Sequence, residues 1–200
     1  MSNVVDFPYT SNKRLREALK LFDKSTAGLA LAELNKLIDQ GCDEAWSYAG
    51  NLYMVGGNGI DRDYVKARYY YEQSVQRIGS VAAYLGLIRI YYYGLGIDRD
   101  YEKAFEYCLL LSKSDNNPYA NFYIGRMYMD GDGIEKDIET AKEYFRKAWS
   151  RDYVFGLTYL GLAEQQSGHW LRGFWYRMKA ALITYGIASK NIKDPRIREF

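Results

Sequence analysis

The sequence predicts an all-α fold, a solenoid of about five helix-turn-helix repeats, and three observations lead to it. A pattern of glycine, aromatic and small residues recurs with a period of 37 residues, which places Ala67, Ala104 and Ala141 at equivalent positions. Each copy joins two stretches with apolar residues at helical spacing through a glycine-rich loop. The length of 200 residues and the 48% hydrophobic content suit one domain or one continuous repeat array.

The first helix of each unit is best seen in the third clear copy. Ala120, Ile124 and Tyr128 fall on one face of this helix. Gly125 lies in its middle, where glycine costs about 1 kcal/mol relative to alanine. A glycine that recurs at such a place indicates close approach of the partner helix.

A Gly-x-Gly loop ends the first helix, because glycine adopts the left-handed conformation that a helix end requires. Ile134 then anchors the loop in the core, and Asp137 stands where an N-cap or a first-turn anion belongs. The second helix carries Ala141, Phe145 and Ala148 at helical spacing. Such a hairpin cannot bury its apolar seam alone, so we expect neighbouring hairpins to stack.

Weaker copies flank the three clear ones. In the first, Asn12–Phe22 and Leu29–Ile38 are the expected helices, and in the last the second helix is expected over Trp170–Tyr185. Atypical terminal repeats are normal, because their outer faces meet water instead of a neighbour. The chain therefore divides into an N-terminal extension at 1–11, a solenoid domain at 12–189 made of repeats 12–42, 44–80, 82–117, 119–153 and 154–189, and a tail at 190–200, expected to be extended or a short cap.

The run from Ala120 to Ala148, with its Ile-Gly pair, Gly-x-Gly-Ile loop and following Asp, resembles the Sel-one-like repeat (SLR), a relative of the tetratricopeptide repeat. The resemblance is close over 45–150 and loose over 12–41 and 154–187. It departs from the pattern at Ile88, where the other clear copies have glycine. It implies a right-handed α/α superhelix used for protein–protein interaction, often as an adaptor in bacterial signalling, envelope biogenesis or host contact.

In such a solenoid the first helices line the concave face, and the residues offset from the apolar seam point into the groove. The predicted partner-binding residues are Asn51, Met54, Leu85, Arg89, Tyr92, Phe122, Arg126, Met129, Thr158 and Leu162. Methionine and aromatic side chains suit adaptable peptide recognition. Arg89 and Arg126 occupy equivalent places and suit the carboxylates of an acidic segment or a C-terminus. The alternative for each arginine is a solvated side chain, or one paired with an acid such as Asp130.

Composition and motifs argue against other classes of function. With 27 Lys and Arg against 25 Asp and Glu, the net charge of +2 does not favour nucleic acid as a partner. One His and two Cys leave little for a metal site or a Cys–His nucleophile. The acidic loops such as Asp61–Asp63 suit helix capping better than calcium binding. We read His169 as a surface or cap residue, and expect no enzyme activity, no cofactor and no metal.

Cellular location is predicted from absent signals. The start of the sequence lacks a basic and apolar leader, and no stretch has the roughly 18 apolar residues of a membrane span. Cys42 and Cys108 are expected to be buried free thiols, which favours the cytoplasm. The apolar stretch Trp170–Ile187 is expected to pack as a terminal helix rather than lie on a membrane surface.

These observations predict a non-enzymatic scaffold or adaptor that binds a peptide or protein segment in the groove. The alternative is a structural module that self-associates into a homodimer through its terminal helices, using the Trp170, Trp175 and Tyr176 helix. A third hypothesis, a small enzyme or ligand carrier, needs convergent titratable groups that the sequence does not offer.

Overall fold

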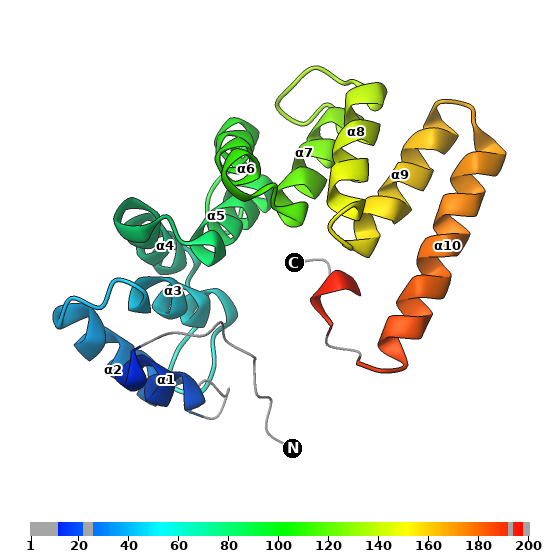
Figure 1. Ribbon diagram of the computed structural model, residues 1–200. Coiled ribbons are helices and arrows are strands. Elements are labelled where there is room, and N and C mark those ends of the chain that lie inside the picture. Colours follow the sequence, from blue (N-terminus) through cyan, green and yellow to red (C-terminus); the bar gives the residue numbers. More distant parts are fainter. Residues whose placement is uncertain (1–11, 22–25, 192–193, 198–200) are drawn as a thin grey trace. The chain divides into compact units, whose positions relative to one another are not determined.

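The computed structural model describes residues 12–21, 26–191 and 194–197, and these residues form ten α-helices, one 3₁₀-helix and no β-strand (Figure 1). The prediction of an all-α repeat fold is confirmed. The described residues belong to two compact units, one ending at Arg99 and the other starting at Asp100. This boundary falls inside the predicted repeat 82–117. The predicted N-terminal extension, 1–11, lies outside the described residues.

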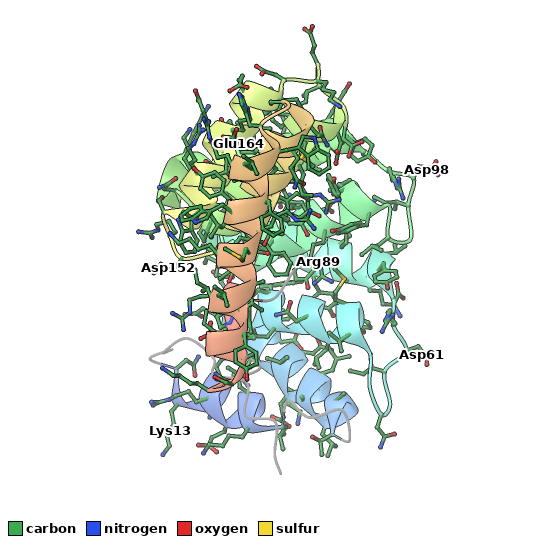
Figure 2. All side chains as sticks on the ribbon, turned by 90° about the vertical axis from the view of Figure 1, so that its right-hand side faces the viewer. Lys13, Asp61, Arg89, Asp98, Asp152 and Glu164 are labelled. Atoms are coloured by element: carbon green, nitrogen blue, oxygen red, sulfur yellow. The ribbon has the colours of Figure 1, made fainter. Side chains whose placement is uncertain are left out.

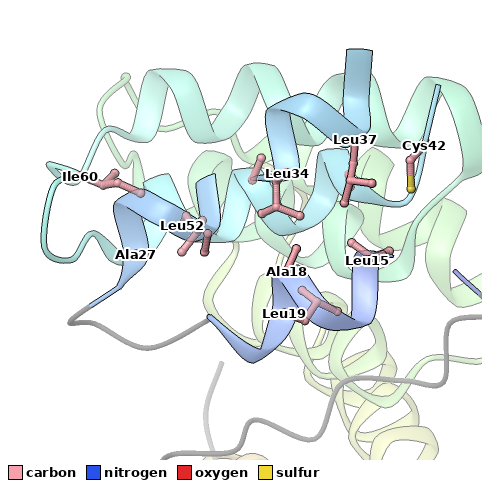
Figure 3. Close-up of a cluster of buried hydrophobic side chains, with 12 residues drawn as sticks. Leu15, Ala18, Leu19, Ala27, Leu34, Leu37, Cys42, Leu52 and Ile60 are labelled. Atoms are coloured by element: carbon pink, nitrogen blue, oxygen red, sulfur yellow. The ribbon is translucent and has the colours of Figure 1, made fainter. Parts of the chain in front are cut away.

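Unit 1 contains α1 (Lys13–Lys20), α2 (Ala27–Asp39), α3 (Ala45–Val55), α4 (Tyr64–Ile78) and α5 (Val81–Tyr93). Successive helices pack on one another, so α2 contacts α1 and α3, and α4 contacts α3 and α5. A cluster of buried apolar side chains joins α1, α2 and α3 (Figure 3). Leu15, Leu34 and Leu52 are among its members, so the atypical first repeat shares a core with the first clear one.

Unit 2 contains α6 (Tyr101–Asp115), α7 (Pro118–Asp130), α8 (Ile138–Trp149), α9 (Val154–Gln166) and α10 (Trp170–Ala188). Here α8 packs between α7 and α9, and α9 packs against α10. The short η1 (Pro195–Ile197) contacts α9 and α10, so the described part of the tail caps the last helix pair. We call α3, α5, α7 and α9, the first helices of their hairpins, the A helices, and α4, α6, α8 and α10 the B helices.

Aspartates cap three of the B helices, as the sequence predicts. The carboxylates of Asp63, Asp100 and Asp137 accept hydrogen bonds from the backbone N–H groups of residues 66, 103 and 140, at 2.9, 3.0 and 3.1 Å. These bonds satisfy donors that have no partner within the first helical turn. Gly94 and Gly131 end α5 and α7 in the left-handed conformation, with φ of 67° and 81°. The roles predicted for the loop aspartates and glycines are confirmed.

The glycines inside the A helices face aromatic rings of B helices. The ring of Tyr71 on α4 packs against Gly50 of α3 and Gly86 of α5, where a Cβ atom would overlap it. In unit 2, a Cβ on Gly125 would lie 2.6 Å from Cε1 of Phe145, which is fully buried. The predicted close helix approach at the recurring glycine is therefore confirmed at Gly50 and Gly125.

Candidate functional site

Four of the ten predicted groove residues are buried. Met54, Tyr92, Phe122 and Met129 expose at most 7% of their surface, so these side chains belong to the interior and the prediction that they contact a partner needs correction. The physical reason is visible in unit 2, where α7 packs on α6, α8 and α9 at once. Apolar side chains on several faces of an A helix are therefore covered. A single apolar seam read from the sequence does not predict which of its residues are buried.

The other six predicted residues remain half-buried, and they are Asn51, Leu85, Arg89, Arg126, Thr158 and Leu162. Two of them already make internal hydrogen bonds. The phenol of Tyr71 donates to Oδ1 of Asn51 at 2.6 Å, and the hydroxyl of Thr158 donates to the backbone oxygen of Val154 at 3.4 Å. The Asn51 bond joins α3 to α4, whereas the Thr158 bond stays within α9.

Arg126 of α7 lies against an aromatic cluster. Its guanidinium carbon is 5.6 Å from the ring centroid of Tyr159 on α9 and 5.9 Å from that of Phe122. The two rings meet edge to face, with centroids 4.9 Å apart. Such contacts restrict the orientation of a guanidinium, which then recognises a carboxylate at a lower entropic cost. Tyr159 was not among the residues predicted from the sequence, although it directly follows Thr158, which was.

We call Tyr119, Arg126, Thr158, Tyr159 and Leu162, all of them half-buried side chains on α7 and α9, the A-helix surface of unit 2. Burial raises the pKa of Tyr119 to about 12, and the nearby carboxylate of Asp194 contributes to this rise. Arg196 holds the pKa of Asp194 down, at about 2, so Asp194 is charged at neutral pH. The surface thus lies next to an acidic group from the chain's own tail, which η1 places against α9.

Unit 1 contributes Arg89 of α5 as a second candidate. Its side chain is half-buried, and its Nε atom is buried without a hydrogen-bond partner among the described residues. Arg89 lies near the phenol of Tyr71, whose pKa is raised by burial and lowered to a smaller extent by this arginine.

An ionic cluster around the buried carboxylate of Glu164, which the sequence did not predict, joins α8, α9 and α10. Glu164 of α9 is 1% exposed (Figure 2), and its carboxylate lies 3.1 Å from Nδ1 of His169 and 3.5 Å from Nη1 of Arg172. Lys142 and Arg146 of α8 each approach it to 3.7 Å. His169 is exposed and precedes α10, as expected, and the turn between α9 and α10 brings it close to the carboxylate of Glu164.

The described residues gather neither a set of metal ligands nor a reactive thiol. In the described ranges, no group of three or more His, Cys, Asp or Glu side chains is placed to hold a metal ion. Cys42 and Cys108 are buried free thiols, as predicted, and burial raises the pKa of both. A raised pKa keeps a thiol protonated at neutral pH, where it is a poor nucleophile. None of the helices in the described part of the chain is both long and apolar enough to cross a bilayer.

Comparison with known proteins agrees with the repeat pattern. A family model described as Sel1 repeat matches residues 46–77, 80–116 and 118–153. A Sel1 repeat protein from Oxalobacter formigenes has a similar structure, with a TM-score of 0.72 and 18% identity over 84% of this chain and 69% of that one. A protective antigen of uropathogenic Escherichia coli with an SLR fold gives a TM-score of 0.60 and 23% identity, over 76% of this chain and 36% of the antigen. No curated protein matches the sequence.

Proposed function

The chain belongs to the Sel1 repeat family, and from this premise we propose that it is a non-enzymatic scaffold or adaptor that binds a segment of another protein along its A helices. Proteins of this family are typically protein–protein interaction modules. The repeat pattern predicts that the A helices line the concave face of the array. Helical repeats suit this task because stacking leaves one side of every A helix for a partner.

The observation that carries this proposal is the setting of Arg126. An arginine held over two aromatic rings offers a directed donor for a carboxylate, and the half-buried ring of Tyr159 beside it offers apolar contact area. Tyr119, Thr158 and Leu162 extend this surface, and Asn51, Leu85 and Arg89 are the candidates in unit 1. The partner segment would be acidic or would end in a free carboxylate.

The test is a binding measurement on the double variant Arg89→Ala/Arg126→Ala. Partners are first captured from a native lysate with the wild-type protein, and the captured protein is then titrated against both forms. We expect binding to weaken by about tenfold or more, because each guanidinium supplies a charge-assisted hydrogen bond. Arg151→Ala, an exposed arginine in the turn after α8, is the matched control. Unchanged binding by the double variant would exclude the arginines as partner contacts.

A second candidate function is self-association into a homodimer through α10. The apolar outer side of this helix supports it. Light scattering at micromolar concentration tests it directly. A single species of 23.2 kDa would exclude this candidate and leave the scaffold proposal intact.

The proposed location is the cytoplasm of a bacterial cell. Two buried free thiols suit a reducing compartment, and both solved relatives come from bacteria. Fractionation of cells that express a tagged full-length protein tests this proposal, and recovery with the membrane or the medium would contradict it.

A further inference from the structure

The outer face of α10 is the most apolar exposed surface in the described part of the chain. Seven of the fourteen exposed large hydrophobic side chains lie on this one helix: Trp170, Leu171, Phe174, Trp175, Met178, Leu182 and Tyr185. Leu171 exposes 88% of its surface and Tyr185 77%. Their spacing of three or four residues makes one continuous face, and we use the name outer face for these seven residues. Contiguous apolar surface of this kind marks an interaction site.

The packing of the helices within each unit indicates what kind of element could cover the outer face of α10. The B helices α4 and α8 are each covered from two sides, α4 by α3 and α5, and α8 by α7 and α9. By contrast, α10 packs on α9 and η1 within the described residues, and its buried residues are the small Gly173 and Ala180. In Figure 2, α10 is the helix in front, and no other helix of its unit covers it. The outer face therefore occupies the position where the A helix of a further hairpin would pack.

The charge of α10 indicates the chemistry of that partner. The helix carries Arg172, Arg177 and Lys179, and no Asp or Glu between Trp170 and Ala188. With 3.6 residues per turn, Arg177 lies on one edge of the outer face, and Arg172 and Lys179 lie on the other. Neighbouring side chains orient these cations, since Nη1 of Arg177 donates to Oε1 of Gln165 at 3.1 Å and Nζ of Lys179 lies 5.2 Å from the ring centroid of Trp175.

An apolar face with cations along both edges is complementary to an apolar face with carboxylates along both edges. Two copies of α10 would instead bring cations against cations, because neither copy supplies an acid. We propose that the outer face of α10 docks an acidic amphipathic α-helix of a partner protein. The docked helix packs there as the A helix of a further hairpin does. This surface is separate from the A-helix surface of the proposed function.

Two synthetic peptides provide the probe. Both are helices of about 18 residues with one leucine stripe, long enough to follow α10. One carries glutamate beside the stripe and the other carries lysine at the same positions. Fluorescence anisotropy of the labelled peptides reports binding to the full-length protein. We expect the glutamate peptide to bind about tenfold or more tightly than the lysine peptide, with affinity falling as salt is raised.

The protein variants locate the binding on α10. Leu171→Gln/Phe174→Gln is expected to weaken binding of the glutamate peptide by about tenfold, and Arg177→Glu/Lys179→Glu is expected to reverse the preference. The matched control is Leu110→Gln on α6, a leucine that is 53% exposed. Because all these side chains are at least partly exposed, helicity and the urea midpoint of each variant are expected to stay near those of the wild type, and both are measured.

Three outcomes overturn the proposal. Failure of both peptides to bind, or equal binding of both, excludes an acidic helix as the occupant. In a second outcome neither peptide binds, but the protein sediments with vesicles of phosphatidylcholine and phosphatidylserine, and Leu171→Gln/Phe174→Gln does not. This result would assign the outer face to a membrane surface. A concentration-dependent dimer that the same variant abolishes would assign it to a second copy. None of these outcomes bears on the test at Arg89 and Arg126.

Discussion

Close packing within each unit depends on glycines inside the A helices. Gly50 and Gly86 leave room for the ring of Tyr71, and Gly125 leaves room for the ring of Phe145. Protein interiors are packed as densely as organic crystals, so even one added methyl group has to displace a neighbour. The loss of helix propensity at these glycines is therefore offset by close contact with a neighbouring B helix, within the hairpin for Gly50 and Gly125 and with the preceding hairpin for Gly86.

Replacing one such glycine tests this account. Gly125→Ala and Gly186→Ala add the same methyl group inside a helix and gain similar helix propensity. At Gly186 nothing lies within 4 Å of the new Cβ, whereas at Gly125 it meets the buried ring of Phe145 at 2.6 Å. We expect urea denaturation to show Gly125→Ala to be less stable than Gly186→Ala by about 1–3 kcal/mol.

A second substitution shows whether the ring is responsible. Phe145→Leu shortens the side chain that faces Gly125, so adding it to Gly125→Ala is expected to cost less than the two single changes predict together. Strict additivity of the two substitutions would mean that the Phe145 ring does not limit the space at Gly125.

The carboxylate of Glu164 on α9 lies close to cations of both α8 and α10. Lys142 is 2% exposed, and it lies between Glu139 at 2.7 Å and Glu164 at 3.7 Å. Glu164→Gln keeps the shape but removes the charge, which leaves Lys142 with one carboxylate partner. Because the buried ammonium of Lys142 loses one of its two carboxylate partners and keeps Glu139 at 2.7 Å, we expect only part of the cost of an uncompensated buried charge, a loss of about 1–2 kcal/mol in the free energy of unfolding. Glu143→Gln, an exposed glutamate of α8, is the control, and equal stability of the two variants would contradict the account.

At the scale of whole elements, the start of each clear B helix is determined locally. Asp63, Asp100 and Asp137 stand at the same place in three repeats, and each caps its helix. Hydrogen bonds to the charged carboxylate lower the pKa of Asp137 from its usual 3.8, and the largest contribution comes from the Thr140 hydroxyl. The pKa of Asp63 is lowered for the same kind of reason, led by the backbone N–H of Lys66.

The capping role predicts a pH dependence. Because the pKa of Asp137 is lower in the folded than in the unfolded chain, its stabilising effect is complete above pH 3.8 and is lost as the pH falls through the folded pKa. We expect Asp137→Ala to lower the urea midpoint at pH 7, and the difference from the wild type to shrink under acid conditions. Asp137→Asn is expected to retain most of the stability, since asparagine also caps helices. A difference independent of pH would exclude the charged cap.

Helix positions in the sequence were easier to predict than the exposure of their side chains. Periodicity located the hairpins, and the glycines and aspartates located the loops, because capping and helix termination depend on neighbours a few residues away. Met54, Tyr92, Phe122 and Met129 were wrongly placed on the partner side. Periodicity identifies one apolar face, but an A helix such as α7 is covered by several helices, and the number of neighbours is a tertiary property.

At the scale of the molecule, the tail brings a charge from the end of the chain to α7. Asp194 contributes to the raised pKa of Tyr119, although burial is the larger cause. We expect Asp194→Asn to lower the pKa of Tyr119 from about 12, because a nearby negative charge disfavours the tyrosinate. NMR titration of tyrosine labelled at Cζ measures this shift. Glu135→Gln, in the loop beyond the opposite end of α7, is the control, and a pKa unaffected by Asp194→Asn would mean that the tail lies elsewhere in solution.

The sequence alone determined the class of fold, the order and the approximate bounds of the hairpins, the capping residues and the recurring glycines. All of these features depend on interactions between residues close in sequence, and the same residues recur every 37 positions. Only the tertiary structure decided which groove candidates remain accessible, that Tyr159 lies beside Arg126, that the carboxylate of Glu164 lies 3.1 Å from His169, and that α10 presents an apolar face between cations. The physical reason is that exposure and charge pairing depend on helices far apart in the sequence, whose packing the local pattern does not specify.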